Sequence, residues 1–246
     1  MTTIQRDMEE QSDNISMTYI SLAHLTHLSS FSHPSALMHY TNLKLSINAH
    51  LSDNVTWTYP IPELGEGGTC SLLGKLASEP FDISVPLGGK SANAKRLVSV
   101  ATAATHYYRE NTKSADWFGV YIIIKEKEKD SSSLLKLSYF GAPSRPLFPL
   151  TKEFADISNN SNVGMTSMGR VINNVKQYVA DGNPYYTCDP KVNSEACLPI
   201  FNRETSRIIG IVDSESFKED AFAEGEYELL IGVVCALGEM LCSDNS

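Results

Sequence analysis

Several features that define other classes of protein are scarce or absent in this sequence. No apolar run approaches the roughly 20 residues that a bilayer-spanning helix needs. The N-terminus is too acidic for a transit peptide and lacks the apolar core of a signal peptide. Positive charge is also scarce, because 20 Lys and Arg residues stand against 29 Asp and Glu residues, for a net charge of −9. These absences argue against a membrane or a nucleic acid as the partner, and we expect a cytoplasmic protein.

Cysteine is infrequent, with 5 residues in a chain of 246. These residues are widely spaced, at Cys70, Cys188, Cys197, Cys235 and Cys242. An odd number without metal-finger spacing is typical of free thiols in a reducing compartment. The N-terminal histidines include the pair His24 and His27, but no carboxylate or thiol stands near them at ligand spacing. We therefore expect no metal site and no bound cofactor.

The composition changes along the chain and predicts two parts. The first 60 or so residues are rich in Ser, Thr, Asn and His, and leucines at helical spacing predict only a weak helix within 16–31. A stretch rich in Pro and Gly follows, which is typical of a linker or a long loop. The sequence thus predicts a polar, partly ordered extension with a long loop over residues 1–90, followed by one domain over residues 91–246.

Regular hydrophobic patterns begin at about residue 92. Amphipathic spacing predicts helices over 92–110, 163–172 and 220–241. Apolar runs predict strands over 116–125, 134–140, 194–201 and 207–214. The order helix, two strands, helix, two strands, helix predicts an α+β domain with a central antiparallel sheet flanked by helices.

Charged side chains stand inside two of the predicted strands, where an unpaired charge is unfavourable. Because positions two apart share one face of a strand, Asp213 and Glu215 should point the same way. The same holds for Trp117 and Tyr121, and Glu195 lies on the neighbouring predicted strand. If these faces meet, carboxylates that suit an ammonium group, or a polarised S=O group that must accept a proton, lie beside aromatic rings that suit a methylthio group. Taken one at a time, each carboxylate could equally face solvent.

Cys188 stands in a polar loop, between Pro184 and Pro190. Loop thiols are usually accessible, but reactivity requires thiolate character, and nearby carboxylates raise the pKa of a thiol. The pattern alone therefore leaves both a nucleophile and a bystander thiol open.

Several segments of the chain resemble the GAF-fold free methionine-(R)-sulfoxide reductases. Asp-Trp-Phe-Gly-Val-Tyr at 116–121 is similar to the family's Asn-Trp-x-Gly-Phe-Tyr strand. Cys-Asp at 188–189, followed by Asn-Ser-Glu at 193–195, resembles the segment that supplies the family's nucleophile. Ile-Gly-Ile-Val-Asp-Ser-Glu-Ser at 209–216 resembles the family's Ile-Gly-Val-Leu-Asp-Ile-Asp-Ser strand. The resemblance extends over most of the chain after residue 91.

The resemblance implies an activity and a set of site residues. Cys188 would be the nucleophile that attacks the sulfur of free methionine sulfoxide and becomes a sulfenic acid. The implied substrate-binding residues are Trp117, Tyr121, Glu195, Asp213 and Glu215. Thioredoxin or another thiol would be the reductant, in a role linked to oxidative stress. Homodimers are common among GAF folds, so the resemblance also allows a homodimer.

The chain departs from the family at the cysteine that closes a disulfide with the nucleophile, because Gly164 stands at that position. Glu215 also stands where the family has Asp. Cys197, which should share the face of Glu195, or Cys70 in the long loop could take over the resolving role, or an external thiol could reduce the sulfenic acid directly. The alternative function is a catalytically impaired GAF module that binds or senses a small molecule in the same pocket.

Overall fold

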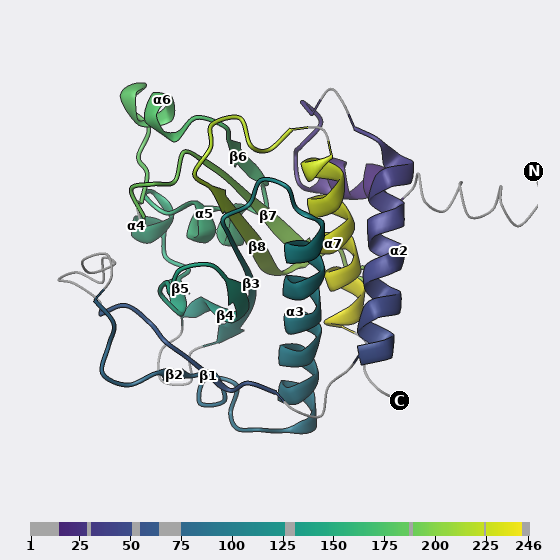
Figure 1. The fold of residues 1–246 in the computed structure, drawn as a ribbon, viewed down its shortest axis with the longest axis vertical. Helices are drawn as coiled ribbons and strands as arrows, with labels where there is room; N and C mark the ends of the chain where they lie inside the picture. The colour runs from purple at the N-terminus through teal and green to yellow at the C-terminus, as the bar shows by residue number, and fades with distance from the viewer. Residues whose placement is uncertain are drawn as a thin grey trace, which may run out of the picture.

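The computed structural model describes most of the chain. The described residues are 15–28, 31–50, 55–63, 75–125, 131–186, 189–223 and 225–242. They form a central sheet with long helices along one face and short helices along the other (Figure 1). Among these residues, no helix combines the length and the apolar character that crossing a bilayer requires.

The central sheet is antiparallel and has the strand order β5-β4-β3-β8-β7-β6. Its strands are β3 (Trp117–Lys125), β4 (Ser132–Phe140), β5 (Leu147–Pro149), β6 (Arg170–Ile172), β7 (Ser194–Phe201) and β8 (Ile208–Ser216). A separate pair joins β1 (Thr58–Tyr59) to β2 (Phe81–Asp82). The four predicted strands are confirmed, and the short edge strands β5 and β6 are additions.

The helices are α2 (His33–His50), α3 (Ala92–Asn111), α4 (Lys152–Ala155), α5 (Asn159–Thr166), α6 (Val175–Ala180) and α7 (Glu226–Met240). The predictions of α3 and α7 are confirmed. Of the helix predicted over 163–172, only residues 163–166 are helical: α5 ends at Thr166, the next residue is left-handed with a φ of 62°, and residues 170–172 form β6. Of the weak helix predicted over 16–31, residues 15–22 are helical, and the chain then turns at His24.

Helix α2 lies in the region that the sequence predicts to be a partly ordered extension, yet it packs against α7. Leu43 and Ile47 of α2 are fully buried in the same apolar cluster as Val233 of α7. The two helices approach closely at Gly232, where an added Cβ would lie 2.6 Å from the carbonyl oxygen of Ala36. This part of the N-terminal region therefore contributes to the core of the domain.

Two glutamates in the first turn of α7 hold the ends of the neighbouring helices. Glu228 accepts a hydrogen bond from the backbone N–H of Ser32, just before α2. Glu226 accepts hydrogen bonds from the Thr112 hydroxyl and the Lys113 N–H, just after α3. Negative charge is also favourable at the N-terminus of a helix. These contacts fix the three long helices as one layer, which Figure 1 shows side by side.

Alternate residues of the strands supply two different clusters. Phe118 and Leu198 belong to the large core beneath α2, α3 and α7. Trp117 and Cys197, each one position away, belong to a smaller cluster on the opposite face, where α5 contacts β7 and β8. The second face carries the candidate site.

Candidate functional site

Strand register brings the predicted carboxylates together on one face. Glu195 of β7 stands opposite Glu215 of β8, and Glu215 stands opposite Trp117 of β3. In the next row of the same face, Asp213 lies between Cys197 and Gly119. Residues from three neighbouring strands thus meet, as the shared-face argument requires.

Aromatic side chains wall this face. The Trp117 indole donates a hydrogen bond from Nε1 to the carbonyl oxygen of Ala142, at 2.9 Å. It lies over Gly119, where an added Cβ would be 2.5 Å from the ring. Tyr121 is buried beside Phe148, with ring centroids 5.7 Å apart. A glycine at 119 therefore leaves the space that the indole occupies above the strand.

Asp213 is a buried acid of the site whose pKa is strongly raised. It is 3% exposed, and its Oδ2 accepts a hydrogen bond from Asn160 Nδ2 at 3.0 Å, whereas Oδ1 has no hydrogen-bond partner among the described residues. Burial, followed by the charges of Glu195 and Glu215, raises the pKa of this carboxyl well above its usual range. A protonated Asp213 can donate the proton that a departing oxygen needs.

Glu195 is buried as deeply, at 5% exposure. Burial raises the pKa of its carboxyl, while a hydrogen bond from Tyr185 and the charge of Arg170 act in the opposite direction. The Arg170 guanidinium is fixed beside the site by a 2.9 Å hydrogen bond to Asn159 Oδ1. Two neighbouring acids with raised pKa values favour a site that handles protons.

Cys197 shares the face of Glu195, as predicted, but it is fully buried among the apolar residues of the site cluster. Burial, then Asp213 and Glu195, raises the pKa of its thiol well above the usual range. The thiol is therefore protonated at neutral pH and a poor nucleophile. Cys188 and Cys70, the two other cysteines predicted to act here, lie outside the described residues.

Two tyrosines that precede Cys188 in the sequence, and that were not among the predicted site residues, contact the site. Tyr185 bonds Glu195, and Tyr186 lines the cavity. Tyr186 also receives a 3.2 Å hydrogen bond from the buried Arg145, whose guanidinium lies within 5.8 Å of the rings of Phe148, Phe154 and Tyr186. The run Tyr-Tyr immediately before Cys188 was the available signal, since aromatic residues beside a reactive loop can close a pocket.

A buried lysine stands behind the site. Lys136 is fully buried, and its Nζ donates hydrogen bonds to the Ser144 carbonyl and hydroxyl oxygens, at 2.9 and 2.6 Å. It also lies 4.1 Å from the ring centroid of Tyr139 and 5.6 Å from that of Trp117. Its positive charge lowers the pKa of Asp213, in opposition to burial. The sequence did not indicate that Lys136 is buried beside the site, because a lysine in a strand usually faces solvent.

These side chains enclose a small cavity. Its lining consists of Trp117, Tyr121, Ser144, Phe148, Ser158, Asn159, Asn160, Tyr186, Glu195, Asp213 and Glu215. All five predicted substrate-binding residues are in this set. The cavity volume is about 20 Å³, which is room for about one water molecule. An amino-acid ligand therefore enters only if part of the wall moves.

Solved structures of other proteins have a similar fold. Free methionine-R-sulfoxide reductase from Neisseria meningitidis, solved in complex with its substrate, matches with a TM-score of 0.50 and 16% identity, over 86% of this chain and 92% of that chain. The type II free methionine-R-sulfoxide reductase from Thermoplasma acidophilum matches with a TM-score of 0.49 and 21% identity, over 61% and 94%. A structure of a GAF domain matches with a TM-score of 0.49 and 13% identity, over 85% and 96%. No family model and no curated protein matches the sequence.

At such identities the likeness concerns the fold. The antiparallel order β5-β4-β3-β8-β7-β6, with helices on both faces, agrees with the predicted α+β class. The chain has the GAF fold, which it shares with free methionine-R-sulfoxide reductases and with GAF domains.

Proposed function

We propose that this site reduces free methionine-(R)-sulfoxide to methionine, with Cys188 as the nucleophile and thioredoxin or another thiol as the reductant. The observation that carries the proposal is the pairing of two buried acids of raised pKa with aromatic walls, next to the loop that bears Cys188. The acids suit the oxygen and the ammonium group of the substrate, and Trp117 and Tyr121 suit its methylthio end. A reducing cytoplasm is the compartment that this chemistry needs.

The connectivity of the chain limits how far Cys188 can be from the site. Tyr186 lines the cavity, and Cys188 follows two residues later. Consecutive Cα atoms are about 3.8 Å apart, so two residues of chain span at most about 8 Å. The proposal requires the Cys188 thiol to reach a ligand between Trp117 and Asp213 within this span.

The proposed reaction balances without a metal or an organic cofactor. The Cys188 thiolate attacks the sulfoxide sulfur, Asp213 or Glu195 protonates the oxygen, and the oxygen passes to Cys188 as methionine leaves. The products are methionine and a Cys188 sulfenic acid. A reductant thiol then attacks the sulfenic sulfur, which releases water and forms a mixed disulfide, and a second thiol restores the Cys188 thiol.

The small cavity makes an opening step part of the proposal. Tyr186 is the lining residue that lies nearest to Cys188 in the chain, and it is held by Arg145. Withdrawal of Tyr186 from this aromatic cluster would enlarge the cavity beside Asp213. Loop motions of this kind commonly admit substrate and then exclude water.

Recycling by an external thiol fits the described residues better than an internal disulfide. Cys197 is buried with a protonated thiol, and a Cβ at Gly164 would lie 2.7 Å from Leu150 Cδ2, so the space for the family's resolving cysteine is filled. A resolving role for Cys70 is the remaining internal route.

The burial of the Cys197 thiol favours a second candidate function. A pocket with no accessible partner thiol among the described residues could bind free methionine sulfoxide, or a similar small zwitterion, without turning it over. The buried carboxylates and aromatic walls would then serve recognition alone, as in a GAF-type sensor module.

A single-turnover experiment separates the two functions. The prereduced protein is mixed with a stoichiometric amount of free methionine-(R)-sulfoxide without reductant, then methionine is quantified and sulfenic acid is trapped with dimedone. The proposal expects about one methionine per chain and dimedone on Cys188, with no methionine from Cys188→Ser and normal release from the matched variant Cys197→Ser. Calorimetric binding without methionine release from the wild type would favour the sensor module instead.

A further inference from the structure

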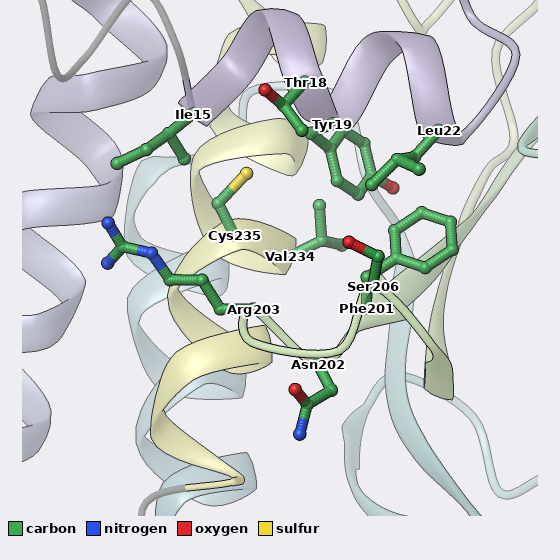
Figure 2. A pocket seen from close by; sticks show the side chains of 10 residues that line it. All are labelled: Ile15, Thr18, Tyr19, Leu22, Phe201, Asn202, Arg203, Ser206, Val234 and Cys235. Carbon is green, nitrogen blue, oxygen red and sulfur yellow. The ribbon is translucent and has the colours of Figure 1, made fainter.

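A second cavity lies away from the candidate site, at the far end of β7 (Figure 2). It is lined by Ile15, Thr18, Tyr19, Leu22, Phe201, Asn202, Arg203, Ser206, Val234 and Cys235. Its volume is about 300 Å³, the lower end of the range for small-molecule sites. We infer that this cavity is a binding site for a small amphiphilic carboxylate.

The cavity has a fixed apolar wall. Phe201 and Val234 are buried, and they come from the end of β7 and from α7. Tyr19 closes a third side, with its ring 5.8 Å from that of Phe201 and its hydroxyl donating a 2.8 Å hydrogen bond to the carbonyl oxygen of Pro199. Figure 2 shows Tyr19 and Leu22 descending from the helical residues 15–22 toward Phe201 and Val234. A short hydrocarbon tail or ring fits between these surfaces.

Positive charge exceeds negative charge at one edge of the cavity. Arg203 and Lys44 share a single carboxylate, because Glu239 pairs with Arg203 through Oε2 and with Lys44 through Oε1. Tyr40 donates a hydrogen bond to the same carboxylate. Within this cluster of described side chains, two cations face one anion, which leaves one positive charge, whereas the whole chain has a net charge of −9. The guanidinium is half exposed, so it can also meet an anion at the cavity mouth.

The polar lining is compatible with an anion. None of the described lining residues is acidic, whereas the candidate site has three carboxylates. On the α7 side of the cavity stands Cys235, and burial raises the pKa of its thiol to about 12. The thiol is therefore neutral at pH 7 and does not repel a carboxylate. An apolar wall, a neutral thiol and a surplus cation together define the ligand class.

The inference does not depend on the proposed function. Phe201 belongs to the core beneath the long helices, whereas Glu195 at the start of β7 lies on the opposite face, in the candidate site. The two cavities share no lining residue. A ligand with a tail and a carboxylate thus suits the second cavity, and a compact zwitterion suits the first.

Binding is tested by an NMR titration of the full ¹⁵N-labelled chain with hexanoate, and with hexanol and hexylamine as neutral and cationic controls. We expect saturable shifts at the amides of Thr18, Leu22 and Cys235, and tighter binding of hexanoate than of either control. Arg203→Gln should weaken hexanoate about threefold to fivefold and leave hexanol unchanged, because the charge is partly exposed. The matched variant Arg207→Gln, on the same hairpin but outside the lining, should bind as the wild type does.

A blocking variant locates the ligand independently of charge. Thr18 is exposed at the mouth, so Thr18→Trp should close the cavity without disturbing the core. The matched variant Met17→Trp alters the next residue, which is 58% exposed and not part of the lining. Loss of hexanoate shifts in Thr18→Trp alone supports the site. Absence of saturable shifts, shifts that survive Thr18→Trp, or equal binding of hexanol and hexanoate would each overturn the inference.

Discussion

Both faces of the central sheet are buried, but only the site face carries buried carboxylates among its apolar residues. On the face covered by the long helices α2, α3 and α7, Leu198 and Val212 are 1% and 0% exposed. On the site face, Glu195 and Asp213 are 5% and 3% exposed. Apolar groups gain free energy when they leave water, whereas ionisable groups lose hydration, which is why the pKa values of both acids are raised. One face therefore stabilises the fold, whereas the other retains buried carboxylates that disfavour folding but suit proton transfer.

The largest effect is expected when a carboxylate is introduced on the face covered by the long helices. Val212→Asp places a carboxylate among the apolar residues of the large core, and we expect a loss of about 4 kcal/mol or more in the free energy of unfolding. Urea denaturation of the variant and the wild type measures this difference. The adjacent substitution Asp213→Asn is the matched control, and it should unfold no more easily than the wild type at pH 7. Equal losses from the two substitutions would mean that the faces do not differ.

The pH dependence of stability should come in part from Asp213. Its pKa in the folded protein is raised above the usual value of 3.8, so above pH 3.8 the folded state holds a proton that the unfolded state has lost. Stability from this group therefore falls as the pH rises from 3.8 toward the folded pKa, by at most about 1.4 kcal/mol per pH unit. Asp213→Asn removes this fall, so its stability advantage over the wild type should grow with pH. A constant difference between the two proteins across pH 4 to 8 would contradict the raised pKa.

A smaller effect is expected at Lys136, which brings positive charge to the site face. Lys136→Met removes the hydrogen bonds to Ser144 and the contacts with aromatic rings, at a cost of about 1–2 kcal/mol. Because Lys136 lowers the pKa of Asp213, the pKa of that carboxyl should move further up. A ¹³C NMR titration of the aspartate carboxyls measures the change, with the exposed Lys125→Met as the matched control. An Asp213 titration that is the same in Lys136→Met and Lys125→Met would refute the electrostatic contact.

The smallest effect concerns the packing of α5 on the site face. Gly164→Ala adds a Cβ that would lie 2.7 Å from Leu150 Cδ2, and this overpacking costs about 1–3 kcal/mol before the helix propensity of alanine returns about 1 kcal/mol. Shortening the neighbour with Leu150→Val should relieve the contact. Thermal or urea unfolding of both single variants and the double variant should then give a double loss smaller than the sum. Additive losses would show that Gly164 and Leu150 do not compete for the same space.

The sequence was most informative where side-chain periodicity reflects burial. Asp213 and Glu215 stand two positions apart at the end of the apolar strand β8, and this spacing alone placed them on one face. It was least informative for α2, because a stretch rich in His, Ser and Asn has little intrinsic preference for helix and is held by packing on α7. The helix predicted over 163–172 ran past the end of α5, since nothing in the local pattern indicated the left-handed turn after α5.

The site was predicted only in part for a similar reason. Strand positions carry a sequence signal, so Trp117, Tyr121 and the three carboxylates could be selected. Arg145 and Tyr186 come from loops, and their contacts depend on how distant segments meet. No local pattern encodes such contacts, and the size of the cavity likewise follows from packing alone.

Steady-state methionine release from free methionine-(R)-sulfoxide shows whether the site is that of a reductase. The assay is run with dithiothreitol and, separately, with thioredoxin and its reductase. We expect turnover with dithiothreitol that is lost in Cys188→Ser and strongly reduced in Asp213→Asn. No methionine with either reductant, from folded protein that binds the sulfoxide, would contradict a reductase and leave a binding module.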